Sequence, residues 1–257
     1  MKIGIIYCAY NCFSYVKDSL HSFAECKRQG LISQICGVSI PFAEYFDLNQ
    51  TKDCTTDFLI DLHKKQLIDQ LFTEPNYIKE HEARDLCLQY LKNANCDTIW
   101  MVDGDEFYSV EDIKNIINFI NDNPNYYWYS INFKNYIFDG KQWIDGFCPP
   151  RIFRTKSNIL NIDKFYWDND ICYQDENKKI FNYKLLDNLI IPKEIAHIKH
   201  MTWLHENGRA KYEYQMKHFG YCGYKWNYES QQLELNEDFF LKTNQKIPNI
   251  LKDNDII

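Results

Sequence analysis

Residues 98–105 read Thr-Ile-Trp-Met-Val-Asp-Gly-Asp and contain the strongest local signal in the sequence. Residues 98–102 form a continuous apolar run, which is typical of a central strand covered on both faces. Asp103 and Asp105 follow at its carboxyl end, separated by Gly104. Ligands of open α/β sheets bind beyond the carboxyl ends of the strands, so this acidic turn is predicted to lie at a functional site.

The sequence before this run alternates between strand and helix periods. Strands are expected at residues 1–7 and 35–40, and helices at 13–28, 59–71 and 78–91, the first of which ends before Gly30. Strands that alternate with helices predict a mostly parallel central sheet flanked by helices.

The sequence after the acidic turn changes in character. Ser109 and Asp112 form a capping pair at the start of a predicted helix that continues to residue 120. Beyond Pro124 aromatic and β-rich segments predict mixed strands. We therefore expect an α/β fold with one domain over residues 1–230, divided at 122/123, and a polar C-terminal extension over residues 231–257.

Composition excludes several classes of protein. The net charge of -7 argues against a nucleic-acid partner, because such binding depends on Lys and Arg side chains that neutralise phosphates. Apolar runs are too short for a membrane span, and the ten cysteines are scattered without a Cys-x-x-Cys pair. This pattern predicts a cytoplasmic protein with reduced thiols and no transmembrane segment.

The acidic turn itself suggests metal chemistry. Two carboxylates separated by one small residue can face the same point, and such hard oxygen ligands bind Mg²⁺ or Mn²⁺ while phosphate oxygens complete the shell. The structural alternative is that Asp103 and Asp105 only stabilise a turn, since Asp-Gly is a common turn pair.

Three segments of the chain resemble the GT-A glycosyltransferases, in particular glycosyltransferase family 2. They are residues 5–11 (IIYCAYN), residues 82–85 (EARD) and residues 97–105 (DTIWMVDGD). The resemblance implies a Rossmann-like GT-A domain whose first half binds the nucleotide and whose second half faces the acceptor. It implies nucleotide contacts from these residues: Tyr7, Ala9, Asn11, Arg84 and Asp103.

The same resemblance extends to a late histidine segment, residues 197–203, which reads HIKHMTW. In GT-A enzymes a histidine of such a segment often supplies a metal ligand, and imidazole suits Mn²⁺ better than Mg²⁺. The predicted metal ligands are Asp103, Asp105 and His200, with His197 as the reserve candidate.

Transfer of a sugar would also require groups on the acceptor and leaving-group sides. Asp168 and Asp170 are candidate catalytic bases, with turn residues as the alternative. Lys211 is a candidate cation for the departing diphosphate, with a solvated helix face as the alternative. The resemblance favours a UDP-sugar donor, whereas the acceptor, which could be a glycan, a lipid or a protein, is not indicated.

Two other functions fit parts of this pattern. A sugar-nucleotide nucleotidyltransferase would also bind nucleotide and metal, but such enzymes open with a Gly-rich basic loop, whereas residues 8–12 read CAYNC. A catalytically silent nucleotide-binding module of the same fold also fits.

Overall fold

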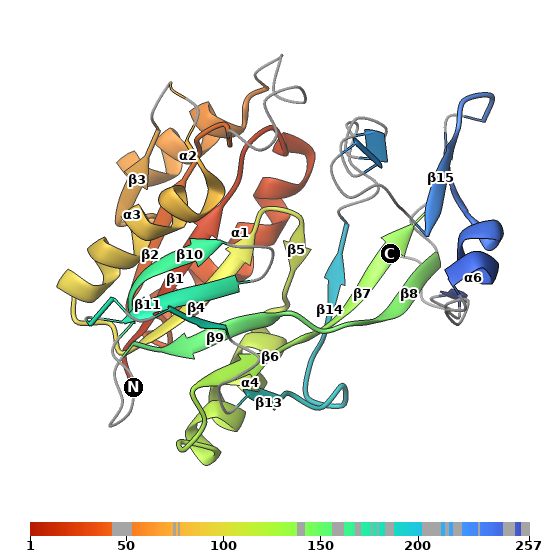
Figure 1. The fold of residues 1–257 in the computed structure, drawn as a ribbon. Helices are drawn as coiled ribbons and strands as arrows, with labels where there is room; N and C mark the ends of the chain where they lie inside the picture. Colours follow the sequence, from red (N-terminus) through yellow and green to blue (C-terminus); the bar gives the residue numbers. More distant parts are fainter. Residues whose placement is uncertain are drawn as a thin grey trace.

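A computed structural model describes residues 1–42, 53–73, 76, 78–137, 142–155, 162–167, 171–175, 177–178, 180–182, 188–201, 212–213, 216–217, 223–230, 232–243 and 250–252 (Figure 1). Its centre is a seven-stranded sheet in the order β13-β6-β9-β4-β1-β2-β3. The strands are β1 (Ile3–Cys8), β2 (Gln34–Val38), β3 (Gln70–Phe72), β4 (Thr98–Asp103), β6 (Trp128–Ser130), β9 (Pro150–Arg154) and β13 (Asn188–Ile190).

Most neighbouring strands of this sheet run in the same direction. β1 is parallel to both β2 and β4, β2 is parallel to β3, and β13 is parallel to β6. β9 is antiparallel to its two neighbours, β4 and β6. The predicted α/β architecture with a mostly parallel central sheet is therefore confirmed.

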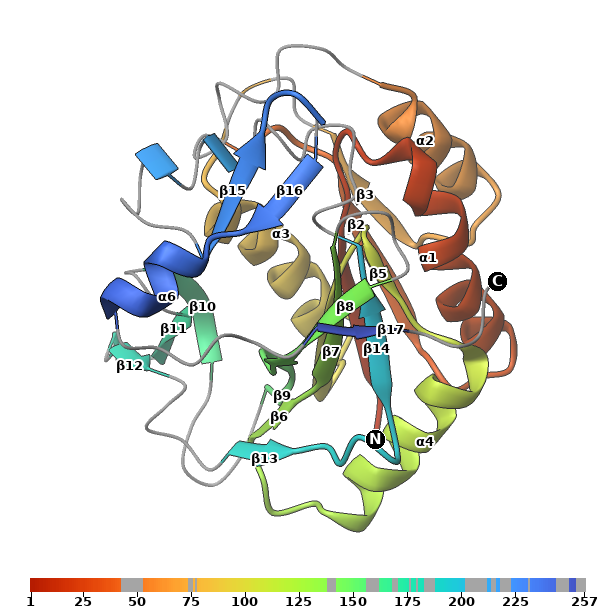
Figure 2. The ribbon, with the colours of Figure 1, turned by 90° about the vertical axis from the view of Figure 1, so that its right-hand side faces the viewer.

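Helices cover both faces of the sheet, as Figure 2 shows. Helices α1 (Phe13–Arg28), α2 (Thr55–Lys64) and α4 (Val110–Asp122) pack on one face, and α3 (Glu80–Asn93) packs on the other. β4 contributes Trp100 and Val102 to the first core, and Ile99 and Met101 to the second. The continuous apolar run was predicted to be a central strand covered on both faces, and both faces of β4 are indeed buried.

The helix predicted over residues 59–71 is wrong in its second half. α2 ends at Lys64, and residues 70–72 form β3, which pairs with β2. Gln66 has a left-handed φ of 60°, and the Leu67 N–H bonds to the Leu62 carbonyl 3.0 Å away. This C-terminal turn ends the helix, and the apolar residues after it then pack along the sheet edge.

Other local predictions are confirmed. Gly30 has a φ of 75° and follows the end of α1. The Ser109 hydroxyl accepts a hydrogen bond from the Asp112 N–H, while the Asp112 carboxylate accepts one from the Ser109 N–H, and α4 begins at Val110. These two groups satisfy amides that would otherwise lack partners at the start of the helix.

The second half builds a smaller, mixed sheet beside the first (Figure 1). Its order is β17-β8-β7-β14-β5, in which only β7 and β14 are parallel. The strands are β5 (Glu106–Phe107), β7 (Asn132–Ile137), β8 (Gln142–Phe147), β14 (His197–His200) and β17 (Ile250–Lys252). The remaining elements are β10 (Ile162–Trp167), β11 (Ile171–Asp175), β12 (Ile180–Asn182), β15 (Tyr224–Asn227), β16 (Gln232–Leu235) and α6 (Glu237–Thr243). The mixed strands predicted for the second half are confirmed.

The pairing of the strands does not follow the boundaries predicted at residues 122/123 and 230/231. β6, β9 and β13 lie beyond residue 122 but complete the central sheet, whereas β5 lies before it and joins the small one. Within the predicted extension over residues 231–257, β16 pairs with β15 and β17 pairs with β8. Strand pairing between distant segments, which local composition does not report, makes these parts of one fold.

The sequence also predicted reduced cysteine thiols and no transmembrane segment. Eight cysteines have free thiols, and most of these are buried: Cys8, Cys12, Cys26, Cys36, Cys54, Cys87, Cys96 and Cys148. Among the described helices, none is long and apolar enough to cross a membrane.

Candidate functional site

The acidic turn lies where the order of the central sheet changes direction. From β1 the chain passes to β2 on one side, and it later returns to place β4 on the other. β1 and β4 are parallel, with Cys8 opposite Asp103, so their carboxyl ends meet at one edge. This is a topological switch point, the place where open α/β sheets bind ligands.

Gly104 keeps the turn close to the end of β1. Its N–H donates to the Cys8 carbonyl oxygen at 2.8 Å. A Cβ atom at this position would lie 2.7 Å from Cys12 Sγ and 2.9 Å from Ala9 Cβ, both far inside contact distance. The small residue between the two carboxylates is therefore required by packing against the loop that follows β1.

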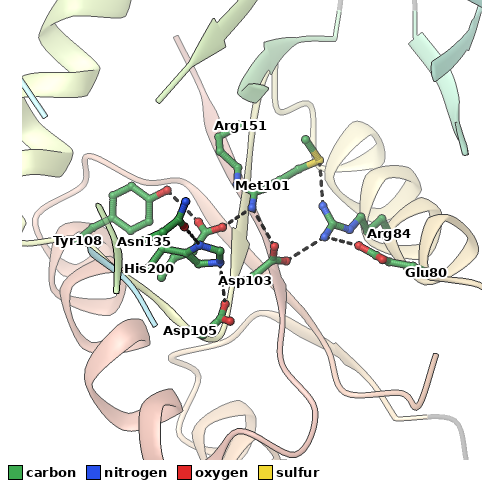
Figure 3. A network of polar contacts seen from close by, with 10 residues as sticks. Glu80, Arg84, Met101, Asp103, Asp105, Tyr108, Asn135, Arg151 and His200 are labelled. Atoms are coloured by element: carbon green, nitrogen blue, oxygen red, sulfur yellow. Dashed lines mark hydrogen bonds and ion pairs between the residues drawn. The ribbon is translucent and has the colours of Figure 1, made fainter. Parts of the chain in front are cut away.

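Asp103 is held between two arginines. Its Oδ1 accepts from Arg84 Nη2 at 2.9 Å and its Oδ2 accepts from Arg151 Nη2 at 3.0 Å (Figure 3). Arg84 also contacts Glu80 Oε1 at 2.6 Å, and Arg151 contacts Glu106 Oε1 at 2.5 Å. Helix α3 and strand β9 thus place fixed cations on this side of the turn.

These ion pairs are buried, which determines their electrostatics. The Arg84 and Arg151 side chains are only 5% and 8% exposed, and Glu106 is fully buried. Burial raises the pKa of Glu106 to about 8, against the opposing effect of Arg151. Burial alone would lower the pKa of Arg151, but Glu106 and Asp103 raise it above its usual value. Tyr108 donates a further hydrogen bond to Glu106 at 2.9 Å. Both arginines stay charged, because the neighbouring carboxylates raise the pKa of each guanidinium.

Asp105 points the other way, toward His200. The Asp105 Oδ1 and His200 Nε2 atoms are 3.7 Å apart, beyond hydrogen-bond distance. On the far side of the ring, His200 Nδ1 lies 2.5 Å from Asn135 Oδ1, and the ring of Phe133 packs against it with centroids 5.2 Å apart. Figure 3 shows the two aspartates turned toward these different partners.

Strand pairing in the small sheet creates this second arrangement. β14 lies between β7 and β5, with His200 opposite Asn135 on one side and opposite Glu106 on the other. The Met201 N–H also donates to the Asp105 carbonyl oxygen at 2.9 Å. The late histidine is thus joined by backbone hydrogen bonds to the turn that the sequence singled out.

The residues at this turn have the chemistry that a divalent cation needs. A carboxylate oxygen and an imidazole nitrogen are suitable donors for Mn²⁺, and the asparagine on the other ring nitrogen is a typical outer partner of a ligating histidine. Carboxylates also outnumber guanidinium groups at the site, even when Glu106 is protonated: Glu80, Asp103, Asp105 and Glu106 against Arg84 and Arg151. Within the described ranges, no group of three or more His, Cys, Asp or Glu side chains surrounds one point. The structure brings the predicted ligands Asp105 and His200 together, whereas the two carboxylate oxygens of the third predicted ligand, Asp103, accept hydrogen bonds from Arg84 and Arg151.

The loop after β1, which was predicted to contact the nucleotide, forms hydrogen bonds with the segment before α2. Asn11 has a left-handed φ of 49° and its Oδ1 accepts from the Asp53 N–H at 3.1 Å. Asp53 in turn accepts from the Phe13 N–H at 2.9 Å. Ala9 is buried below Gly104. These contacts stabilise the loop beside the acidic turn.

Tyr7 requires a correction. Its side chain is fully buried in the core beneath α1, and its hydroxyl forms a 2.5 Å hydrogen bond with Ser19 Oγ. Alternate residues of a strand face opposite sides of the sheet, and Tyr7 faces the side covered by α1, α2 and α4. The Tyr7 side chain therefore belongs to the core and cannot contact a nucleotide at the sheet edge.

His197, the reserve metal candidate, lies on the opposite face of β14 from His200. Its Nε2 is 3.6 Å from Asp145 Oδ1, and its ring packs edge-on against Trp143. Side chains three residues apart on a strand point to opposite faces. The structure therefore brings His200, and not His197, to the acidic turn.

Three predicted residues, Asp168, Asp170 and Lys211, lie outside the described residues. In contrast, Arg151 and Asn135 are central to the site but were not predicted. The only signal for Arg151 was a weak one, a charged residue at the edge of the short β-rich segment Arg151–Arg154. Nothing in the local sequence distinguishes Asn135.

Comparisons with known proteins give only distant similarities. No protein-family model matches the chain, and no curated protein matches it. S. aureus TarS 1–349 is similar with a TM-score of 0.45 and 14% identity, over 84% of this chain and 64% of that one. The complex of TarS 1–349 with UDP-GlcNAc is similar with a TM-score of 0.39 and 17% identity, over 63% and 48% of the two chains. A putative glucose-1-phosphate thymidylyltransferase from Bacillus anthracis, in complex with a sucrose, is similar with a TM-score of 0.35 and 14% identity, over 52% and 55%. The chain spans less than two thirds of the length of each of these structures.

Proposed function

We propose that this chain is a metal-dependent glycosyltransferase of the GT-A type, which transfers a sugar from a nucleoside-diphosphate sugar to an acceptor hydroxyl. The observation that carries the proposal is the pairing of Asp105 with His200 at the switch point between β1 and β4. A carboxylate and an imidazole beyond the carboxyl end of a central strand are suited to hold a cation against a diphosphate. The resemblance of residues 82–85 and 97–105 to glycosyltransferase family 2 points to the same reaction.

In this proposal Asp105 and His200 bind Mn²⁺, or Mg²⁺ with a lower preference. Bound there, the ion would offset the negative charge that collects on the departing diphosphate. Phosphate oxygens and water would complete its shell, because among the described residues no group of three or more His, Cys, Asp or Glu side chains could hold a metal ion. The excess of carboxylates over arginines at the turn supplies a further electrostatic attraction for the cation.

Asp103 has a different role in the proposal. Arg84 and Arg151 occupy one side of its carboxylate and keep it ionised and fixed in orientation. An ionised carboxylate at 27% side-chain exposure can still accept a hydrogen bond, and a ribose hydroxyl is a suitable donor. Arg84 then acts through Asp103, because its own side chain is too buried to reach a ligand directly.

The acceptor side of the reaction rests on the sequence alone. Asp168 and Asp170 remain the predicted bases, and Lys211 remains the predicted cation for the leaving group. UDP-sugars are the first donors to test, because the resemblance favours them.

The test measures release of free nucleoside diphosphate from a panel of nucleotide-sugars with Mn²⁺, with Mg²⁺ and with EDTA. We expect release from a UDP-sugar that requires the metal. Asp105→Asn should reduce it at least about 100-fold, because the substitution removes a charged ligand. Glu111→Gln is the matched control, since Glu111 is an exposed carboxylate of α4 outside the site.

Two results would contradict the proposal. One is metal-dependent release that Asp105→Asn leaves at the wild-type rate. The other is the absence of any thermal stabilisation by nucleoside diphosphates with Mn²⁺, since a ligand that binds only the folded state must raise the melting temperature.

A further inference from the structure

We infer that Asn135 is a positioning residue, which holds the neutral His200 ring in the tautomer that presents the Nε2 lone pair toward Asp105. Asn135 does not touch the cation in this inference. It acts through His200, and it sets the affinity of the site for a divalent metal. The metal-binding part of the inference rests on the proposed function, whereas the tautomer does not depend on it.

The geometry leaves one donor for the contact between the two side chains. His200 Nδ1 lies 2.5 Å from the Asn135 carbonyl oxygen, Oδ1, which can only accept a hydrogen bond. His200 Nδ1 must therefore carry the proton. A neutral imidazole carries a single N–H, so Nε2 is left with a lone pair.

The lone pair faces a negatively charged group. His200 Nε2 is 3.7 Å from Asp105 Oδ1, so two electron-rich atoms face each other without a hydrogen between them. This arrangement is unfavourable by itself and becomes favourable when a cation lies near both atoms. Histidines that bind metals usually donate their other N–H to a carbonyl, a carboxylate or water, which is the arrangement at Asn135.

The ring cannot easily turn to exchange its two nitrogens. β14 is hydrogen-bonded between β7 and β5, which fixes the His200 backbone from both sides. The Phe133 ring lies against the imidazole with an interplanar angle of 32°, and the His200 side chain is only 11% exposed. Strand register places Asn135 directly opposite His200, so the hydrogen bond and the packing act on the same orientation.

A pair of substitutions separates the hydrogen bond from the packing. Asn135→Leu keeps a branched side chain of similar size but removes the acceptor. Asn135→Asp keeps an acceptor oxygen at the same position. We expect Asn135→Leu to weaken Mn²⁺ binding about 10- to 100-fold and Asn135→Asp to bind within a few-fold of the wild type, the range typical of outer partners of a ligating histidine.

Two measurements test this without relying on turnover. Isothermal titration with Mn²⁺ gives the affinity. Long-range ¹⁵N–¹H correlation spectra of the histidine rings, recorded without metal at about pH 8.5 where an ordinary imidazole is neutral, give the tautomer of His200. We expect a protonated Nδ1 in the wild type and in Asn135→Asp, and a mixture of tautomers in Asn135→Leu.

The matched control is Asn132→Leu. Asn132 is a buried residue of the same strand whose side chain donates to the Ile191 carbonyl at 2.7 Å, and it pairs with His197 on the other face of the sheet. Its substitution should lower the melting temperature but leave Mn²⁺ affinity and the His200 tautomer unchanged. Weakening of Mn²⁺ binding by Asn132→Leu as large as that by Asn135→Leu would mean that both act only through stability, and would overturn the inference.

Other outcomes are equally decisive. A protonated Nε2 in the wild type, or Mn²⁺ affinity that is the same in the wild type and in Asn135→Leu, overturns the inference. If instead tautomer and affinity respond as expected while no nucleotide-sugar is cleaved, the inference stands and the proposed glycosyl transfer fails.

Discussion

Asp103 and Asp105 are two residues apart, yet the two sides of the turn differ in kind. Asp103 faces arginines whose positive charge is permanent and almost completely buried. Asp105 faces a histidine whose nearest ring nitrogen is 3.7 Å away. On the first side the protein supplies the counter-charge itself, whereas on the second the counter-charge in the proposed function is a divalent cation. In the proposed function, the arginine side stabilises the structure and the histidine side binds the metal ion.

The largest expected effect tests the histidine side. Asp105→Asn should abolish measurable Mn²⁺ binding, a loss of at least about 100-fold, because a neutral amide is a poor substitute for a charged ligand. Its unfolding midpoint in urea should stay close to that of the wild type, since no buried ion pair is broken. Titration calorimetry and denaturation measure both quantities, and a variant that binds Mn²⁺ normally would end the distinction between the two sides.

The next effect tests the arginine side. Arg151→Met leaves Glu106 and Asp103 without their shared cation, and breaking a buried pair costs about 3–5 kcal/mol. Because Glu106 can take up a proton, we expect about 3 kcal/mol, or a decrease in Tm of about 6–12 °C. Arg154→Met is the control, since the Arg154 guanidinium donates to the neutral Ile120 carbonyl and Tyr129 hydroxyl. Equal losses in calorimetric melting would show that burial of the ion pairs does not matter.

A smaller effect tests the residue that separates the two sides. Gly104→Ala introduces a methyl group 2.7 Å from Cys12 Sγ and 2.9 Å from Ala9 Cβ, and such overpacking costs about 1–3 kcal/mol. Adding Cys12→Ala should restore part of this loss, because it removes the nearest atom. A double-mutant cycle by urea denaturation measures the coupling, and strictly additive losses would show that the turn relaxes without that contact.

The smallest effect compares the two histidines of β14. His197→Gln should leave Mn²⁺ affinity unchanged, because this side chain faces away from the turn. Burial lowers the pKa of His197, with Asp145 opposing, so the unfolded chain binds this proton more readily. The wild type should therefore lose stability as the pH falls below about 6.5, the unfolded pKa. His197→Gln should lose less over the same interval, and melting curves between pH 7 and pH 5 will check this.

Much of the fold follows from local signals that the sequence displays. The apolar run before Asp103 predicted a strand buried on both faces, and the Ser109 and Asp112 pair predicted the start of α4; both are confirmed. The boundary of α2 was mistaken, because the apolar period continues past Gln66 although its left-handed backbone ends the helix. Periodicity reports burial, and residues buried in a short edge strand can imitate one more turn of helix.

The site was predictable only in part. Asp105 and His200 were predicted together as ligands of one metal ion, and the structure brings their side chains to the same turn. Arg151 is 48 residues from Asp103, and Asn135 is 65 residues from His200. Neither belongs to a local motif, because each reaches the turn through the register of a strand pair.

The sequence by itself determined that a buried strand ends in two carboxylates separated by a glycine, and that helices surround that strand. Only the tertiary structure decided which partner each carboxylate meets. β9 brings a permanent cation to Asp103, and β14, paired between β7 and β5, brings an oriented imidazole to Asp105. The physical reason is that hydrophobic periodicity is encoded between near neighbours in the chain, whereas strand order and register depend on contacts between distant segments.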